Sequence, residues 1–250
     1  MTGSVKKRLD ALLVDKGLAP SGQQARALIM AGNVLVNDVP VTKAGTRIAA
    51  DADIKVKDQC PYVSRGGLKL EGALDALNLN VAGLTCLDVG ASTGGFTDCL
   101  LQRNAAHVFA VDVGYGQFAW KLRQDPRVTV IERTNIRHIK PGALPGPVDL
   151  AVIDTSFISL KIVIPATLPF LKPDGSILAL IKPQFEVGKG KVGKGGVVRD
   201  PALHKEVIDD LTAWAAANNL SASPAIQSPT PGPKGNIEFF AIFKPVAPSC

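Results

Sequence analysis

The sequence predicts an α/β protein in which a doubly wound, mostly parallel sheet follows a small α+β domain. From residue 84 onward, apolar runs alternate with helix patterns, as they do in open parallel sheets. The first run ends in a glycine-rich turn at residues 88–95, and a helix pattern begins directly after it. Residues 6–59 instead show two short helix patterns and then a hairpin pattern, which indicates a separate unit.

The composition fits a globular protein with an anionic partner. Of the 250 residues 46% are hydrophobic, enough for a core, and the net charge is +6. The cysteines and histidines are scattered without metal-ligand spacing, so no metal is expected, and Cys86 and Cys99 are expected as core thiols. The first residues lack a signal-peptide pattern, and no apolar run approaches the roughly 18 residues of a membrane span. We therefore expect a cytoplasmic location without stable membrane association.

The elements of the first unit follow from local signals. A helix is expected from residue 8 to near Gly17, and Ser21 is the candidate N-cap of a second helix over 23–30. Asn37-Asp38 suits a hairpin turn, and residues 53–56 are typical of a further strand.

The charge of the first unit leaves two interpretations. Up to residue 60, nine Lys and Arg residues face six Asp and Glu residues. This favours either a solvated α+β domain or an RNA-docking module. The residues around Arg8 and Arg26 resemble the S4 RNA-binding domain, which implies that both arginines contact RNA. The predicted domains are an S4-like domain over 1–59, a linker over 60–63 and a second domain over 64–250.

The second domain is predicted from its alternating pattern. Strands are expected near 84–89, 107–112, 127–131, 149–153 and 175–181, followed by a helix over 201–218 and a last, antiparallel strand over 237–243. Trp120 and Trp214 fall in helix patterns and are expected in the core.

The glycine-rich turn indicates the cofactor. Asp88 precedes the turn, and Asp112 ends the next strand, where such folds bind ribose hydroxyls. The turn reads Gly90-Ala-Ser-Thr-Gly-Gly, which departs from the pyrophosphate-binding G-x-G-x-x-G pattern. An acid before the turn suits an ammonium group better than a phosphate. We therefore expect S-adenosylmethionine, which has no phosphate.

Charged residues stand where buried strands end. Asp154 and Lys182 each follow an apolar run, and Glu238 interrupts the last one. Ligands of open α/β sheets bind outside the carboxyl ends of the strands, so these residues, together with Lys69, form either ordinary ion pairs or a catalytic cluster. A lysine accepts a proton where desolvation or another cation disfavours its charged form. Lys182, near Lys69, is thus the candidate base for a ribose 2′-hydroxyl.

Other residues near this rim are candidates for RNA contact. Arg65, Arg133 and Arg137 either face phosphates or are ordinary surface residues. Lys189 lies in a basic, glycine-rich segment at 188–199, which is expected to be a mobile lid that touches RNA rather than a solvated loop. Phe157 is expected either to stack on a base or the cofactor, or to be an ordinary core residue.

Several motifs resemble the TlyA (haemolysin A) family of ribosomal-RNA 2′-O-methyltransferases. These motifs are Tyr62-Val-Ser-Arg-Gly-Gly-Leu-Lys69, Leu87-Asp-Val-Gly-Ala-Ser-Thr-Gly-Gly-Phe96, Ala110-Val-Asp-Val-Gly-Tyr-Gly-Gln117, Asp154-Thr-Ser-Phe-Ile-Ser-Leu160 and Ile181-Lys-Pro-Gln-Phe-Glu186. That family joins an S4 domain to an FtsJ-like, Rossmann-like methyltransferase domain. The resemblance implies cytidines of ribosomal RNA as substrate, in the large subunit and in some members also in the small one.

The resemblance also implies roles for single residues. It assigns a catalytic tetrad to Lys69, Asp154, Lys182 and Glu238. It assigns cofactor contacts to Asp88, Gly90, Ala91, Ser92, Gly94, Gly95 and Asp112, with Asn135 near the adenine. Two other functions stay open: a membrane-active cytolysin, and a non-catalytic RNA-binding factor for ribosome assembly. The sequence leaves the oligomeric state open.

Overall fold

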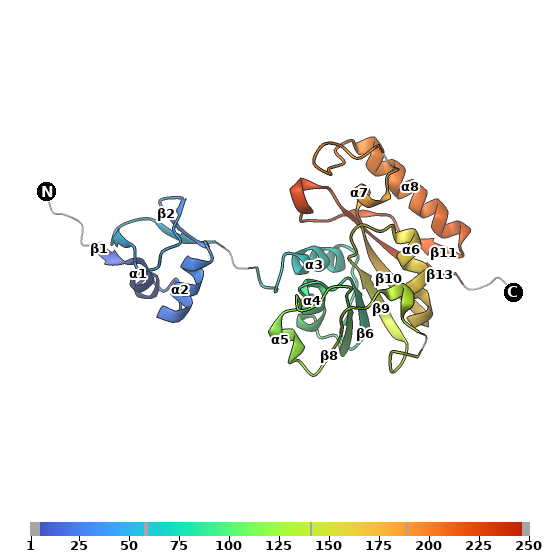
Figure 1. The fold of residues 1–250 in the computed structure, drawn as a ribbon, viewed down its shortest axis with the longest axis horizontal. Helices are drawn as coiled ribbons and strands as arrows, with labels where there is room; N and C mark the ends of the chain where they lie inside the picture. Colours follow the sequence, from blue (N-terminus) through green and yellow to red (C-terminus); the bar gives the residue numbers. More distant parts are fainter. Residues whose placement is uncertain (1–5, 58–59, 141, 189, 247–250) are drawn as a thin grey trace. The chain divides into compact units, whose positions relative to one another are not determined.

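The computed structural model describes residues 6–57, 60–140, 142–188 and 190–246. The chain divides into two compact units, residues 1–60 and 61–250, and Figure 1 labels their elements. Each unit has its own hydrophobic core.

The first unit packs two helices against short strands. Its elements are β1 (Lys6–Arg8), α1 (Leu9–Asp15), α2 (Gly22–Met30), β2 (Val34–Val36), β3 (Val39–Pro40), β4 (Arg47–Ala49) and β5 (Ile54–Val56). Ser21 caps α2, since its Oγ accepts a hydrogen bond from the Gln24 backbone N–H at 3.3 Å. Asn37 and Asp38 both have positive φ, as a two-residue hairpin turn with right-handed twist requires. The predicted cap and hairpin are thus confirmed.

The second unit is built on one large sheet. Its strands are β6 (Thr85–Val89), β7 (His107–Val111), β8 (Val128–Ile131), β9 (Val148–Ile153), β10 (Leu171–Ile181), β11 (Leu220–Ala222), β12 (Ile226–Gln227) and β13 (Phe239–Pro245). Its α-helices are α3 (Gly66–Ala76), α4 (Gly95–Gln102), α5 (Trp120–Arg123), α6 (Leu160–Thr167), α7 (Pro183–Glu186) and α8 (Pro201–Ala217). Three short 3₁₀ turns in the described residues are η1 (Ile136–His138), η2 (Leu168–Phe170) and η3 (Pro233–Gly235).

The strand order defines a doubly wound sheet. The order is β11-β13-β10-β9-β6-β7-β8, and β12 pairs with β13. The pairs from β10 to β8 are parallel, whereas β13 runs antiparallel to β10. The predicted fold class is therefore confirmed, including the antiparallel last strand. The chain order reverses between β6 and β9, which is where ligands bind in such sheets.

Helices cover both faces of this sheet. One core lies under α6 and α8, and the other under α3, α4 and α5. Alternate residues of β10 divide between them: Ile177 and Ala179 face the first core, and Leu178 and Leu180 face the second. Cys86 and Cys99 are fully buried in the second core, as expected of structural thiols.

Two expectations about the elements of the second unit are wrong. Trp120 is 71% exposed, because Phe118 and Leu122 occupy the buried positions around the single turn of α5. Glu238 lies before β13 and not inside a strand, since the strand begins at Phe239. No helix in the described part of the chain is long and apolar enough to cross a membrane.

Candidate active site

The carboxyl ends of β6, β9 and β10 meet at one edge of the sheet. The glycine-rich turn follows β6, Asp154 follows β9, and Lys182 follows β10. Lys69 reaches this edge from α3, and Glu238 reaches it from the residue before β13. Residues from five segments, up to 169 positions apart, therefore converge on one place.

The four expected tetrad residues form two ion pairs. Lys69 Nζ lies 2.6 Å from Glu238 Oε2, and Lys182 Nζ lies 2.6 Å from Asp154 Oδ1. The Glu238 side chain is 0% exposed and both lysine side chains are about one-tenth exposed. Desolvating such charges costs free energy that a buried pair only partly recovers, so buried pairs in a cleft favour a functional role.

Hydrogen bonds fix both ion pairs further. Lys182 Nζ donates to Ser156 Oγ at 3.0 Å. Gln184 Nε2 lies 3.5 Å from Glu238 Oε1, at the limit of a hydrogen bond. Among the described residues, Gln184 Oε1 and Thr155 Oγ1 are buried without a hydrogen-bond partner. Ser156 and Gln184 lie within two of the quoted motifs, but sequence reasoning gave them no role, because a polar residue next to a charged one gives no signal of its own.

The turn after β6 brings its backbone against Asp154. Gly90 has φ +88°, and a Cβ there would lie 2.6 Å from the Asp154 carbonyl oxygen. A side chain at Gly90 would therefore collide with the protein itself. Ser92 also has positive φ, at +50°, an uncommon conformation for a residue with a side chain.

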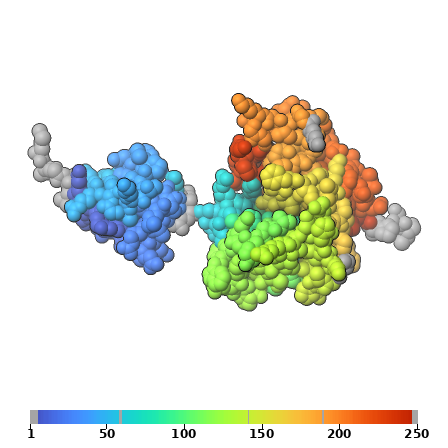
Figure 2. Space-filling view, viewed as in Figure 1, coloured from blue at the N-terminus to red at the C-terminus, as the bar shows by residue number. Residues whose placement is uncertain are grey.

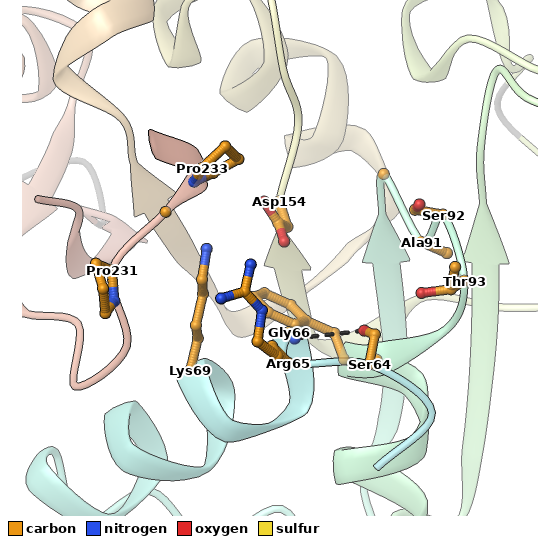
Figure 3. A pocket seen from close by; sticks show the side chains of 14 residues that line it. Ser64, Arg65, Gly66, Lys69, Ala91, Ser92, Thr93, Asp154, Pro231 and Pro233 are labelled. Carbon is orange, nitrogen blue, oxygen red and sulfur yellow. Dashed lines mark hydrogen bonds between the residues drawn. The ribbon is translucent and has the colours of Figure 1, made fainter. Parts of the chain in front are cut away.

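Two cavities adjoin at this turn, and both are lined by Gly90, Ser92 and Asp154. The smaller, of about 380 Å³, also contains Lys69 and the segment 231–233, and Figure 3 shows Lys69 and Asp154 pointing into it. The larger, of about 900 Å³, extends over the ends of β7 and β9. Asp154 thus stands between two separate spaces.

The larger cavity contains Asp112 and Asn135. Asp112 Oδ2 accepts a hydrogen bond from the Ser92 N–H at 2.7 Å, and Oδ1 accepts one from the Gly114 N–H at 2.6 Å. Asn135 Oδ1 accepts hydrogen bonds from the backbone N–H and Nε of Arg137. The Arg137 guanidinium is therefore held against Asn135 at the cavity wall.

Two of the expected cofactor residues line neither cavity. Asp88 is fully buried, and its Oδ2 accepts from the Thr97 backbone N–H at 3.0 Å and from Thr97 Oγ1 at 2.7 Å. A Cβ at Gly94 would lie 2.5 Å from Leu122 Cδ1, so Gly94 packs against α5. Both residues hold the start of α4, whereas Ala91 and Gly95 line the smaller cavity.

Burial changes the acidity of Asp88. Desolvation raises the pKa of this carboxyl to about 7, although the two bonds from Thr97 oppose the shift. Its Oδ1 is buried without a hydrogen-bond partner.

The arginines expected at the rim lie in different settings. Arg65 lines the smaller cavity, and its side chain points upward beside Lys69 in Figure 3. The Arg133 guanidinium lies 3.9 Å from the ring centroid of exposed Tyr115, and Arg133 has φ +52°. Phe157 is 90% exposed with φ +64° and lies against Phe185, so the core interpretation of Phe157 is wrong.

The remaining expected RNA-binding residues belong to other parts of the chain. In the first unit, Arg8 forms two hydrogen bonds with Asp10, at 2.9 and 2.8 Å, and Arg26 is exposed on α2. Lys189 lies outside the described residues. No three His, Cys, Asp or Glu residues that could hold a metal ion lie together in the part that the structure describes.

A doubly wound sheet with this turn at its switch point, and with lysine–carboxylate pairs beside it, defines a Rossmann-like methyltransferase domain. A family model described as FtsJ-like methyltransferase matches residues 62–244, and an S4 domain model matches residues 7–54. The chain belongs to the TlyA (haemolysin A) family, and the resemblance seen in its motifs is confirmed.

Relatives with this architecture carry two kinds of name. The chain is 51% identical to a Mycobacterium tuberculosis protein named 16S/23S rRNA (cytidine-2′-O)-methyltransferase TlyA, over 94% of this chain and 88% of that protein. It is 39% identical to Hemolysin A of Brachyspira hyodysenteriae, over 94% and 99%. A solved structure of a Streptococcus thermophilus protein, described as a hemolysin, matches with a TM-score of 0.74 and 42% identity, over 98% of this chain and 90% of that one.

Proposed function

We propose that this protein transfers the methyl group of S-adenosylmethionine to a cytidine ribose 2′-hydroxyl in ribosomal RNA. The observation that carries the proposal is the Lys182–Asp154 ion pair, whose carboxylate borders both cavities. A group that touches both spaces can orient a cofactor in one and a substrate in the other. The name of the 51% identical relative supports the same reaction. We expect the protein to act in the cytoplasm, on ribosomes or their precursors.

The larger cavity fits the adenosine part of the cofactor. Its volume of about 900 Å³ is typical of a ligand pocket, and apolar and polar side chains contribute to its lining in similar numbers. Each Asp112 carboxylate oxygen accepts one backbone N–H and retains a second lone pair for a ribose hydroxyl. Asn135 would contact the adenine. The remaining part of the cofactor would be contacted by the turn residues Gly90, Ala91, Ser92 and Gly95.

Asp88 and Gly94 would support this cofactor site indirectly. Asp88 bonds Thr97, and Gly94 packs against Leu122, so both hold α4 in place behind the turn. The bound cofactor supplies an electrophilic methyl group.

The chain's own residues then prepare the hydroxyl. In its neutral form Lys182 Nζ would accept the 2′-hydroxyl proton; as an ammonium it would orient the hydroxyl's lone pair by donating a hydrogen bond to the oxygen. Asp154 and Ser156 would hold the nitrogen in place. Lys69, fixed by Glu238, would hold the ribose on the other side of the smaller cavity. Positioning of this kind supplies much of the rate in a group transfer.

RNA would be held by basic residues of both units. The S4 domain would contribute Arg8 and Arg26, and the second unit would contribute Arg133, Arg137 and Lys189. Arg65 would meet a phosphate only at the mouth of the smaller cavity, because it lines that cavity.

Mapping of 2′-O-methyl groups in ribosomal RNA tests this function. Cells with the gene should carry a modified cytidine that cells without it lack, and the purified protein should restore it with labelled S-adenosylmethionine. If no ribosomal nucleotide differs, and the protein labels no ribosomal RNA, the proposed reaction is wrong.

A membrane-lytic activity is the second candidate, because two relatives are described as hemolysins. Leakage of dye from liposomes treated with the purified protein would support it. Methyl transfer without leakage would leave the methyltransferase function alone, and a non-catalytic assembly role would show neither signal.

A further inference from the structure

Two loops of the second unit are fastened together by one side chain. The first is residues 190–199 before α8, and the second is residues 228–236 before β13. Asn236, at 4% exposure, accepts a hydrogen bond at Oδ1 from the Val198 N–H at 3.1 Å. Its Nδ2 donates to the carbonyls of Gly196 and Pro233 at 3.1 and 3.2 Å. In Figures 1 and 2 the orange and red segments lie side by side.

Further contacts make the first loop a folded structure. Lys234 Nζ donates to the Gly195 carbonyl at 3.0 Å, and the backbone N–H of Gly193 donates to the Val197 carbonyl at 3.1 Å. Val197 and Val198 are 4% and 2% exposed. The buried valines and these hydrogen bonds hold residues 193–198 in a turn, and the expectation that the segment 188–199 is a mobile lid stays a prediction.

The second loop contacts the catalytic ion pair. A Cβ on Gly232 would lie 2.1 Å from Glu238 Oε1, so the backbone of this loop packs directly on the carboxylate. Gly232 N–H in turn donates to the Asn236 carbonyl at 2.8 Å. On the other side, Gly72 of α3 leaves room for Pro229, since a Cβ there would lie 2.5 Å from its Cγ.

We propose that Asn236 is a positioning residue for the Lys69–Glu238 pair. Its amide fastens the 228–236 loop to the 190–199 loop, and this holds Gly232 against the Glu238 carboxylate. With Gly232 in place, Glu238 faces Lys69 on one side and packed backbone on the other, and water is excluded. Without the amide, the loop moves away and the carboxylate gains both space and solvent.

The same link joins a basic surface to the catalytic pair. Lys194, Arg199 and Lys234 are exposed on the two fastened loops. Their role as a contact surface for RNA phosphates depends on the proposed function. A phosphate bound there would stiffen the loops that hold Glu238, so binding and positioning would be coupled.

Asn236→Asp tests the proposal with little change in size. The carboxylate still accepts from the Val198 N–H, but it loses both donors and faces two carbonyl oxygens. The matched control is Asn218→Asp, because Asn218 Nδ2 also donates to a backbone carbonyl, that of Trp214 at 2.8 Å, on the exposed end of α8. Lys234→Gln is a milder variant, in case Asn236→Asp fails to fold. It removes the ammonium that donates to Gly195 and also one charge of the basic surface, so its ammonium signal without RNA, and not its kcat, reports the loop link.

Two measurements on the full chain separate positioning from mere stability. The ¹⁵N signal of the Lys69 ammonium reports the ion pair without RNA, and kcat on ribosomal RNA reports its use. We expect Asn236→Asp to lose the slowly exchanging ammonium signal and to lower kcat about 10²-fold, the cost of a small misplacement, with unchanged cofactor affinity. Lys234→Gln should weaken the signal and kcat in the same direction, and Asn218→Asp should change neither.

The outcomes distinguish this inference from the proposed function. A retained ammonium signal in both loop variants, or a kcat unchanged in folded Asn236→Asp, would overturn the positioning role. A lower melting temperature with unchanged kcat would mean that the link is only structural. A wild-type protein that labels no ribosomal RNA would contradict the proposed function, and the ammonium signal would still decide the role of Asn236.

Discussion

Lys172, near the start of β10, and Lys182, just after its end, offer a matched pair of lysines. Lys172 pairs with Asp149 at 2.5 Å at the start of β9, and Lys182 pairs with Asp154 at 2.6 Å just after its end. Only Asp154 lines the cavities. The two ion pairs have similar chemistry, but only the pair with Asp154 borders a cavity.

We predict that Lys182→Arg and Lys182→Ala lose methyl transfer, whereas Lys172→Arg keeps it. Arginine does not lose its proton in a protein, so it can pair with Asp154 but cannot act as a base. General-base catalysis contributes about 10²–10⁴-fold, and turnover should fall by that order. Single-turnover rates with tritiated cofactor across a pH series measure this. Near-normal turnover by Lys182→Arg would leave Lys182 only an electrostatic role.

The raised pKa of Asp88 predicts that the stability of the protein depends on pH. Burial raises its pKa from 3.8 to about 7 in the folded protein, so the folded state binds this proton more tightly than the unfolded one. Its contribution to stability is therefore fully present below about pH 4 and is lost as the pH rises through about 7. We expect Asp88→Asn, which can still accept from Thr97, to remove this part of the decline in melting temperature between pH 6 and pH 8.

The control for Asp88 is Asp125→Asn. The hydrogen bond from Arg127 lowers the pKa of Asp125, so this group stays ionised throughout the same range. Thermal unfolding at pH 6, 7 and 8 compares the two variants with the wild type. An Asp88→Asn protein that declines as steeply as the wild type would show that Asp88 does not titrate there.

At the scale of elements, α6 depends on a carboxylate from another element. Glu186, in α7, accepts from Ser159 Oγ at 2.6 Å and from the Leu160 N–H at 2.8 Å, and so caps the start of α6. Residues 154–159, just before α6, line the larger cavity. The cap therefore fixes the wall of the proposed cofactor site.

We predict that Glu186→Ala lowers both stability and cofactor affinity. Loss of a helix N-cap costs about 1 kcal/mol, and the freed 154–159 segment should weaken binding of S-adenosylmethionine. Asp209→Ala is the control, because Asp209 forms only an exposed ion pair with Lys205 on α8. Calorimetric titration and thermal unfolding measure both effects. Unchanged cofactor affinity in a destabilised Glu186→Ala protein would restrict the cap to a structural role.

The elements were largely predictable because each has a local signal. The central strands lie within a few residues of their expected bounds, since apolar runs and turns mark them. β10 begins at Leu171 and not near residue 175, because its first residues pair with β9 across an irregularity in the register. The prediction that Trp120 is buried was wrong because α5 has only four residues, too few for a hydrophobic pattern to indicate which face is buried.

The site was less predictable, because its geometry is tertiary. Charged residues at strand ends pointed to Asp154 and Lys182, since parallel strands share one edge. Nothing local shows that Asp88 faces Thr97 and not a ligand, or that Asn236 bonds a loop about 40 residues earlier in the chain. Contacts between distant segments leave no periodicity in the sequence.

At the scale of the whole molecule, the two units differ in core size and in net charge per residue. The first has a core of its own around Leu9, Leu13 and Ile29, and the second has two larger ones. Each unit carries a net charge of +3, although the second is about three times as long. The proposed catalytic residues all lie in the second unit. Docking and chemistry should therefore be separable.

We predict that the chain reduced to residues 61–250 binds cofactor normally but binds ribosomal RNA more weakly, with a flatter salt dependence. Fewer basic residues release fewer counterions, so the slope of log affinity against log salt becomes smaller. Filter binding between low and physiological salt measures the slope, and calorimetry measures cofactor affinity.

Point variants of the full chain test the same docking role. Arg26→Ala should reduce the slope by about one if Arg26 contacts a phosphate. The control is Lys55→Ala, which should reduce the slope less, because Lys55 is already paired with Asp38 and Asp53. Equal affinity and equal slope for the truncated and full chains would show that the first unit does not dock RNA.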